Sequence, residues 1–309
     1  MIGELMGCST YLEPNGRMRK SSLASPHRVS LLAMSPNAPR KGTAANSDEV
    51  RQAWNANATF WDSRMGEGNS FHRTLLLPSI ERLLSLKSGE RVLDVACGNG
   101  QLSRWMTEKG ARVVGIDLSE KLIEIARNKP GPGGEKIDYR VVDASDGSAL
   151  SRLGPTSFDA IVCNMALMDM TTIDPLAKAI PSLLKPGGRF IFSVMHPCFN
   201  AGDVRKVARE SEEGGVLRET VGVEVRRYLT ARKVMGLAMV GQPAPQPYFE
   251  RPLHALLNPF LRSALVLDAL EEPTFPNQGG PSDQPWYSWS RFVEIPPALV
   301  VRMIPRVPT

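Results

Sequence analysis

An acid followed by a glycine turn is the strongest chemical signal in this chain of 309 residues. Asp94 lies in the apolar stretch 92–95, and Gly98 and Gly100 follow it directly. In alternating α/β sheets, ligands bind at the carboxyl ends of strands, near the point where strand order reverses. Glycine has no Cβ, so the backbone can turn tightly there and let a ligand come close. A glycine pair alone is weak evidence for a ligand site, so the interpretation depends on the residues around it.

Two neighbouring positions indicate which ligand would suit this turn. Asp117 follows Gly98 by 19 residues, at the end of the next apolar stretch, where a carboxylate can bind a ribose diol. The third glycine of a dinucleotide fingerprint would fall at Ser103. Asp94 would also bring negative charge toward a pyrophosphate. The pattern therefore favours a cationic nucleoside over NAD.

The elements that must position these residues alternate between strand and helix patterns. We predict strands at 91–95, 112–116, 137–142, 158–163 and 189–194, with helices at 101–109, 119–128 and 173–184. A helix at 252–263 and strands at 264–270 and 298–304 follow an interruption at 196–248, which contains a strand-like stretch at 221–229. Such alternation is typical of a doubly wound α/β fold with a mostly parallel sheet. Upstream, we expect a helix from Ser47 and another over 70–86, kinked or divided at Pro78.

Five motifs in this order resemble the class I S-adenosylmethionine-dependent methyltransferases, of the small-molecule type 11 or type 25 kind. They are DVACGNG at 94–100, GIDLS at 115–119, VDA at 142–144, FDAIVCN at 158–164 and LKPGG at 184–188. The resemblance covers about residues 90–195. It implies a seven-stranded Rossmann-like sheet and S-adenosyl-L-methionine as the cofactor.

The resemblance also assigns cofactor contacts to individual positions. The acid and turn of 94–100 would border the methionine part, Asp117 would bind the ribose, and Asp143 would meet the adenine amino edge. A helix cap or a turn is the local alternative for either acid. The residues expected at the cofactor are Asp94, Ala96, Cys97, Gly98, Gly100, Asp117, Leu118, Asp143, Ala144, Asn164 and Met165.

Two features bear on the acceptor. Asn164 is followed by Met-Ala-Leu rather than the Pro-Pro-aromatic of enzymes that methylate nucleobase amines or glutamine, so the resemblance argues against those substrates. His196 directly follows the fifth predicted strand, where it could act as general base near neutral pH. Its alternatives are a site residue without proton transfer and a packed loop histidine.

The acceptor pocket is expected between the N-terminal helices and the segment after His196. Apolar and aromatic side chains there suit an apolar or aromatic metabolite, although aromatics at helical spacing are more often core. The candidate substrate contacts are Trp61, Met65, Asn69, His72 and Tyr248. We predict in-line methyl transfer to a small acceptor, with oxygen, nitrogen and carbon left open. The alternative is a catalytically silent methyltransferase-like binding or assembly protein.

Composition limits the other classes of function. The net charge is +5, but residues 1–46 hold six basic and two acidic side chains, which leaves 31 basic and 30 acidic elsewhere. A near-neutral folded part disfavours nucleic acid as a partner.

Four scattered cysteines predict neither a disulfide framework nor a metal site. No apolar run reaches the roughly 20 residues of a membrane span, so we expect a soluble, cytoplasmic protein. The sequence leaves open whether the protein forms a homo-oligomer.

The expected domain organisation follows from these changes in pattern. Residues 1–46 are a disordered tail, an organelle-targeting segment or the product of a misassigned start, and 47–309 form the methyltransferase domain. Within it we expect lid helices at 47–88, the cofactor core at 89–195, a substrate cap at 196–250 and the last helix and strands at 251–309.

Overall fold

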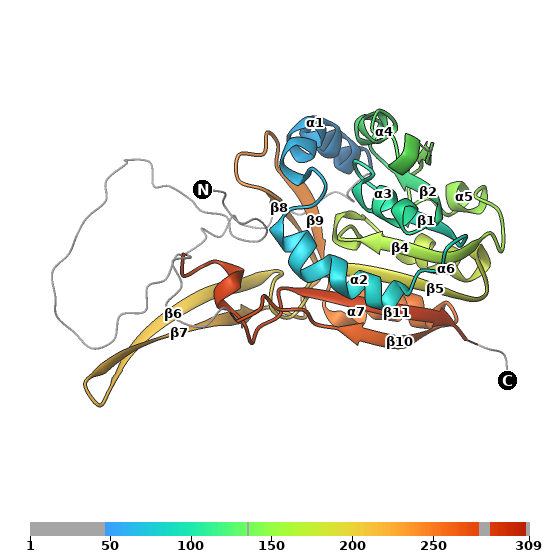
Figure 1. Cartoon of the computed structure of the whole chain (residues 1–309). Helices are drawn as coiled ribbons and strands as arrows, with labels where there is room; N and C mark the ends of the chain where they lie inside the picture. The colour runs from blue at the N-terminus through green and yellow to red at the C-terminus, as the bar shows by residue number, and fades with distance from the viewer. Residues whose placement is uncertain (1–46, 135, 278–284, 307–309) are drawn as a thin grey trace.

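A seven-stranded sheet forms the centre of the computed structural model, which describes residues 47–134, 136–277 and 285–306 (Figure 1). Its strand order is β10-β11-β5-β4-β1-β2-β3. The adjacent strands among β1 to β5 pair in parallel, and β11 is antiparallel to both β5 and β10. The strands are β1 (Arg91–Val95), β2 (Arg112–Asp117), β3 (Asp138–Val141), β4 (Phe158–Asn164), β5 (Leu184–Met195), β10 (Leu265–Glu271) and β11 (Ala298–Pro305). This order confirms the predicted fold class.

Helices cover both faces of the sheet. One core cluster joins the strands to α5 (Gly147–Ser151), α6 (Asp174–Leu183) and α7 (Leu253–Arg262). A second cluster joins them to α2 (Leu77–Leu84) and α3 (Gln101–Glu108). The helix α4 (Glu120–Arg127) packs beside β2 and β3 with its own small cluster. The sheet is therefore covered on both faces, and ligands can reach it at the strand ends.

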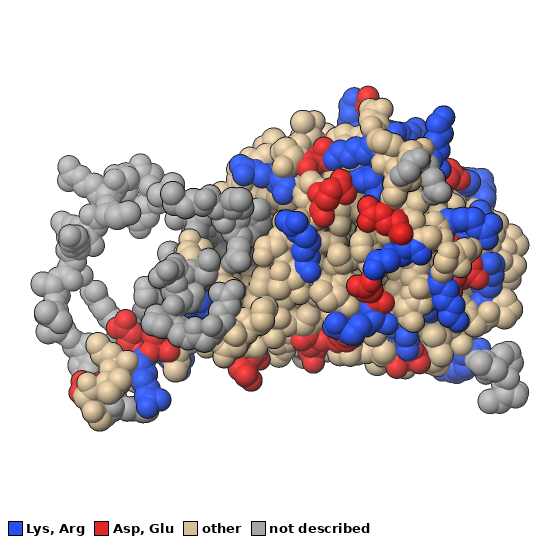
Figure 2. Space-filling model, in the orientation of Figure 1, with Lys and Arg blue, Asp and Glu red and all other residues tan. Residues whose placement is uncertain are grey.

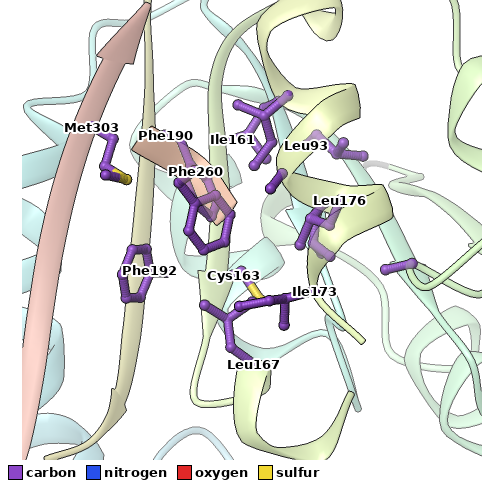
Figure 3. Close-up of a cluster of buried hydrophobic side chains, with 14 of the residues drawn as sticks. Leu93, Ile161, Cys163, Leu167, Ile173, Leu176, Phe190, Phe192, Phe260 and Met303 are labelled. Atoms are coloured by element: carbon purple, nitrogen blue, oxygen red, sulfur yellow. The ribbon is translucent and has the colours of Figure 1, made fainter. Parts of the chain in front are cut away.

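Aromatic packing stabilises the first of these clusters (Figure 3). Phe190 and Phe192 of β5 lie against Phe260 of α7, with ring centroids 5.3 Å and 5.6 Å from it. All three side chains are fully buried. Truncation of such a ring to alanine costs about 3–5 kcal/mol, so this contact fixes α7 on the sheet.

The N-terminal helices differ from expectation at one turn. Helix α1 (Ser47–Met65) begins at the predicted residue, with Asp48 and Glu49 in its first turn. The second helix contains a π-helical turn, η1 (His72–Leu76), before α2. Pro78 has no N–H to donate and its ring crowds the preceding turn, which accounts for the wider turn at this place. Helix α2 ends at Leu84, two residues before the predicted end.

The segment between β5 and α7 forms two antiparallel ribbons rather than one strand-like stretch. They are β6 (Asp203–Glu213) with β7 (Val216–Arg226), and β8 (Arg232–Gly236) with β9 (Gln246–Glu250). The predicted strand at 221–229 starts five residues late, because β7 begins at Val216, before the alternating Val221, Val223 and Val225. Figure 1 shows the β6–β7 ribbon extending away from the sheet.

Short 3₁₀ turns complete the described chain: η2 (Pro132–Gly134), η3 (Leu167–Asp169) and η4 (Trp289–Arg291). Among the described helices, none has the length and apolar character needed to cross a membrane. The predictions for residues 1–46 lie outside the described residues.

Candidate active site

The glycine turn follows β1 in a backbone conformation that favours glycine. Gly98 and Gly100 have φ values of +57° and +78°. A Cβ at Gly100 would lie 2.2 Å from the Tyr139 hydroxyl oxygen, whereas nothing lies within 4 Å of one at Gly98. Ala96, just before the turn, is also left-handed at +56°. Gly100 is thus required for packing, and the space beside Gly98 is open for a ligand.

Asp117 connects the end of β2 to this turn. Its Oδ2 accepts the Gly98 N–H at 2.9 Å, and its Oδ1 accepts the Ser119 N–H at 2.8 Å. Burial raises the pKa of this carboxyl to about 6, and the backbone donors oppose that shift. Each carboxylate oxygen can accept a further hydrogen bond, which suits the two hydroxyls of a ribose.

Asp94 adds a second buried carboxyl at the same edge. It is 1% exposed, and its Oδ2 accepts a hydrogen bond from the Ser103 hydroxyl at 2.6 Å. Burial raises the pKa of Asp94 to about 7, and the charge of Asp117 contributes to the rise. Because two neighbouring buried carboxylates repel each other, a cation bound between them would stabilise both. The donor set therefore fits a cationic nucleoside such as S-adenosylmethionine.

The next two strands supply the remaining predicted cofactor residues. Asp143, after β3, accepts hydrogen bonds from the backbone and hydroxyl of Ser145, so it also forms a turn. Asn164 ends β4, and its Oδ1 accepts the Ser193 hydroxyl at 2.6 Å. Met165 has a φ of +53°, and its N–H donates to the Ser193 carbonyl and hydroxyl. Cys97 and Ala144 are buried, and Leu118 is half-buried.

The N-terminal helix covers the glycine turn. The Asn99 amide donates to Asp62 of α1 at 2.7 Å, and Lys129 forms an ion pair with the same carboxylate. Arg104 of α3 pairs with Glu67 at 2.7 Å. The predicted contacts Trp61, Met65 and Asn69 are half-buried on this covering segment. The segment is therefore fixed to the loop that would hold the cofactor.

His72 carries an unusual orphan donor. It is 1% exposed, and its Nδ1 lies 3.3 Å from the Gln101 amide nitrogen, which makes Nδ1 the acceptor. The proton then lies on Nε2, for which the described residues supply no partner. Burial lowers the pKa of His72 to about 4, so the ring is neutral. A buried N–H without an acceptor costs free energy, which a ligand oxygen would recover.

His196 directly follows β5, and both of its ring nitrogens are engaged. Its Nε2 lies 2.7 Å from the Glu272 carboxylate, and its Nδ1 accepts the Cys198 N–H at 3.1 Å. The ring packs on Phe199 and is 2% exposed. Burial lowers the pKa of His196, and Glu272 opposes that shift. Action as a base would require one of these bonds to open.

Two polar residues that the sequence analysis missed lie beside Tyr248. Asp169 of η3 and Gln246 of β9 are buried, and the Gln246 amide donates to Asp169 Oδ1 at 3.4 Å. An acid within the apolar run Met-Ala-Leu-Met-Asp-Met was an available signal for Asp169. Gln246 carried none, since its burial depends on η3, far away in sequence.

A doubly wound sheet with a glycine turn after β1 and an acid ending β2 defines a nucleoside-binding α/β protein. Residues 93–192 match the methyltransferase domain family. The ubiquinone biosynthesis O-methyltransferase of Idiomarina loihiensis is 33% identical over 169 residues, which span 54% of this chain and 68% of that protein. The protein of the same name from Bordetella bronchiseptica is 35% identical over 50% of this chain and 64% of its own.

A solved structure agrees with these relatives. The S-adenosylmethionine-dependent methyltransferase of Mesorhizobium loti is 28% identical, with a TM-score of 0.52 over 73% of this chain and 95% of that one. The chain belongs to the class I S-adenosylmethionine-dependent methyltransferases. S-adenosylmethionine is its cofactor.

Proposed function

We propose that this enzyme transfers the methyl group to a hydroxyl oxygen of a small, apolar or aromatic metabolite. The observation that supports oxygen is the likeness to proteins named ubiquinone biosynthesis O-methyltransferases. When bound, S-adenosylmethionine supplies an electrophilic methyl group on a cationic sulfonium. Because displacement at that methyl is in-line, alignment and exclusion of water contribute most to the rate.

On this proposal the cofactor lies across the carboxyl ends of β1, β2 and β4. Asp117 binds the ribose hydroxyls, and the open space at Gly98 admits the methionine part. Asp94 balances the positive charge. The wider set of cofactor contacts is Asp94, Ala96, Cys97, Gly98, Gly100, Asp117, Leu118, Asp143, Ala144, Asn164 and Met165.

The acceptor would bind between the covering helix and the β8–β9 ribbon. These two meet directly, because the Asn57 side chain of α1 donates to the Ala244 carbonyl and accepts its N–H. The proposed lining is Trp61, Met65, Asn69, His72 and Tyr248. The orphan Nε2–H of His72 favours a ligand with an oxygen at that point.

The charge distribution supports a small-molecule acceptor. Figure 2 shows lysine and arginine interspersed with acids on the visible face, where a nucleic-acid site would need a continuous basic stripe. Many charged side chains of the described residues form ion pairs, for example Lys109 with Glu81 and Arg82 with Glu271. An RNA substrate is therefore not favoured.

The general-base role of His196 stays a prediction. In the described geometry its Nδ1 lone pair accepts the Cys198 N–H and its Nε2 faces Glu272. Proton transfer to His196 would first require release of the Cys198 N–H. A test of His196 variants must therefore measure turnover and stability together.

Methyl transfer from labelled S-adenosylmethionine to a metabolite extract tests the proposed function. We expect one or a few labelled, extractable products whose methyl group is on oxygen by mass spectrometry. Asp117→Ala, which weakens cofactor binding, should lose the labelling at limiting cofactor. Cofactor binding without any labelled product would instead favour the catalytically silent alternative, and a methyl group on nitrogen or carbon would refute the choice of oxygen.

A further inference from the structure

Asp169 is a largely buried carboxyl with one oxygen to which no described residue donates a hydrogen bond. It ends η3, five residues after β4, and only 8% of it is exposed. Its one side-chain hydrogen bond in the described part of the chain is the 3.4 Å contact of Oδ1 with the Gln246 amide. No described residue donates to Oδ2. A buried carboxyl usually has several donors, so this oxygen is available to a ligand.

The surrounding chain fixes the position of this carboxyl. The Arg251 guanidinium donates to the carbonyls of Leu167, Met170 and Thr171, at 2.9, 2.7 and 3.1 Å. On the other side, Gln246 is 1% exposed and its Oε1 accepts the Gln242 amide at 2.9 Å. Asp169 is thus attached to β9 and flanked by backbone held through Arg251. Such positioning is what a reacting group needs.

Asp169 also lies near the proposed acceptor lining, because η3 packs against β9, which carries Tyr248, and against β5. Burial raises the pKa of Asp169, and the charge of Asp117 adds to the rise. Asp169 in turn raises the pKa values of Tyr248 and Cys163, again after burial. Cys163 pairs with Val95 across β4 and β1, next to the glycine turn. No hydrogen bond within the described ranges ends on the Tyr248 hydroxyl or on Asp169 Oδ2, so both atoms are available to a ligand.

We propose that Asp169 binds the hydroxyl of the acceptor through Oδ2 and takes its proton during methyl transfer, with the Tyr248 hydroxyl contacting the same oxygen. This inference rests on the proposed O-methyl transfer. The acceptor O–H bond breaks and its proton goes to Asp169, a bond forms between that oxygen and the methyl carbon, and the carbon–sulfur electron pair stays on sulfur. S-adenosylhomocysteine is then the second product.

The chemistry of the base narrows the class of acceptor. A carboxylate is a weaker base than an alkoxide or an amine, so the hydroxyl that it assists best is one that is itself fairly acidic. Phenols, with a pKa of about 10 as in tyrosine, meet this requirement far better than aliphatic alcohols. The aromatic side chain of Tyr248 on β9 is suited to packing against such a ring. The inferred substrate class is therefore a phenol.

Binding of 4-nitrocatechol tests this site without relying on turnover. The probe is a coloured phenol, titrated into the protein saturated with S-adenosylhomocysteine and followed by absorbance. We expect saturable binding that Asp169→Asn weakens at least about tenfold and Tyr248→Phe weakens less. Asp138→Asn removes an exposed carboxyl at the start of β3 and serves as the matched control, with unchanged binding.

Two further readouts separate a structural role from the proposed one. Asp169→Asn should keep the melting temperature and the calorimetric affinity for S-adenosylmethionine, while methylation of a phenolic product falls by about 10²–10⁴. No probe binding by the wild type, or equal binding by Asp169→Asn, would overturn the inference. Labelling of extract products with full activity in Asp169→Asn would overturn it while leaving the proposed function intact. If the extract gives no product at all, the proposed function fails and probe binding still decides the role of Asp169.

Discussion

Acidification should weaken cofactor binding through Asp94. Burial raises the pKa of this carboxyl to about 7, the charge of Asp117 adds to the rise, and the Ser103 hydroxyl opposes it. A cation binds a carboxylate better than a carboxylic acid, so the bound cofactor lowers the pKa of Asp94. Binding below neutral pH must then release a proton, and affinity must fall as pH falls.

The size of the effect follows from the raised pKa. If only the ionised form of Asp94 binds the cofactor, the apparent Kd equals the Kd of that form multiplied by a factor. The factor is one plus ten raised to the power of pKa minus pH. Between about pH 7 and about pH 5.5 this gives a roughly 16-fold loss of affinity, or about 1.6 kcal/mol. That window lies below the pKa of about 7.7–8 of the cofactor's own α-amino group. Asp117, with a pKa of about 6, steepens the lower end.

Titration calorimetry with S-adenosylmethionine, in buffers of different ionisation enthalpy, measures both affinity and proton release. Asp94→Asn should remove most of the pH dependence. Ser103→Ala should move its midpoint to higher pH, because the hydroxyl that lowers the pKa of Asp94 is gone. Equal Kd values across the window, with no proton released by the wild type, would refute the reasoning.

Three other variants give distinct expectations. Asp117→Ala loses two charge-assisted hydrogen bonds to the ribose of about 1.5–3 kcal/mol each, so calorimetry on the folded variant should show at least about 10²-fold weaker cofactor binding, and native affinity would contradict the assignment. His196→Ala would lower turnover by about 10²–10⁴ if His196 were the base. With Asp169 as the base, we expect a much smaller loss of turnover. The melting temperature should still fall, because Glu272 and the Cys198 N–H lose their buried partner. Asn57→Ala removes the hydrogen bonds between α1 and the loop that joins β8 to β9 and leaves the backbone of Ala244 unpaired, which should cost about 1–3 kcal/mol in denaturant unfolding. An unchanged midpoint would show that this contact does not stabilise the fold.

The sheet was predictable because its elements are specified locally. The strand predicted at 91–95 is β1, and the helix predicted at 119–128 is α4 with its capping residues Ser119 and Asn128. Their apolar periods and start signals lie within the elements themselves. The ribbons after β5 could not be predicted as fully, because no described side chain of β6 or β7 is buried and only Val221, Val223 and Val225 form an alternating apolar pattern.

The candidate site shows the same difference between residues with a local sequence signal and residues whose partners are distant in sequence. Gly98 and Asp117 could be placed together from the sequence, because Gly98 follows one strand and Asp117 ends the next, at the same edge of a parallel sheet. The contacts of Asp169 and His196 could not, because their partners Gln246 and Glu272 lie 77 and 76 residues away. Those partners decide which lone pairs are free, and hence which residue can take a proton.

A crystal structure of the protein with S-adenosylhomocysteine and a bound catechol tests the central claim most directly. The account predicts the ribose hydroxyls on Asp117, the amino acid part beside Gly98, and the catechol oxygen on Asp169 Oδ2, facing the sulfur. A nucleoside bound away from the ends of β1 and β2, or a catechol oxygen out of reach of the sulfur, would contradict it.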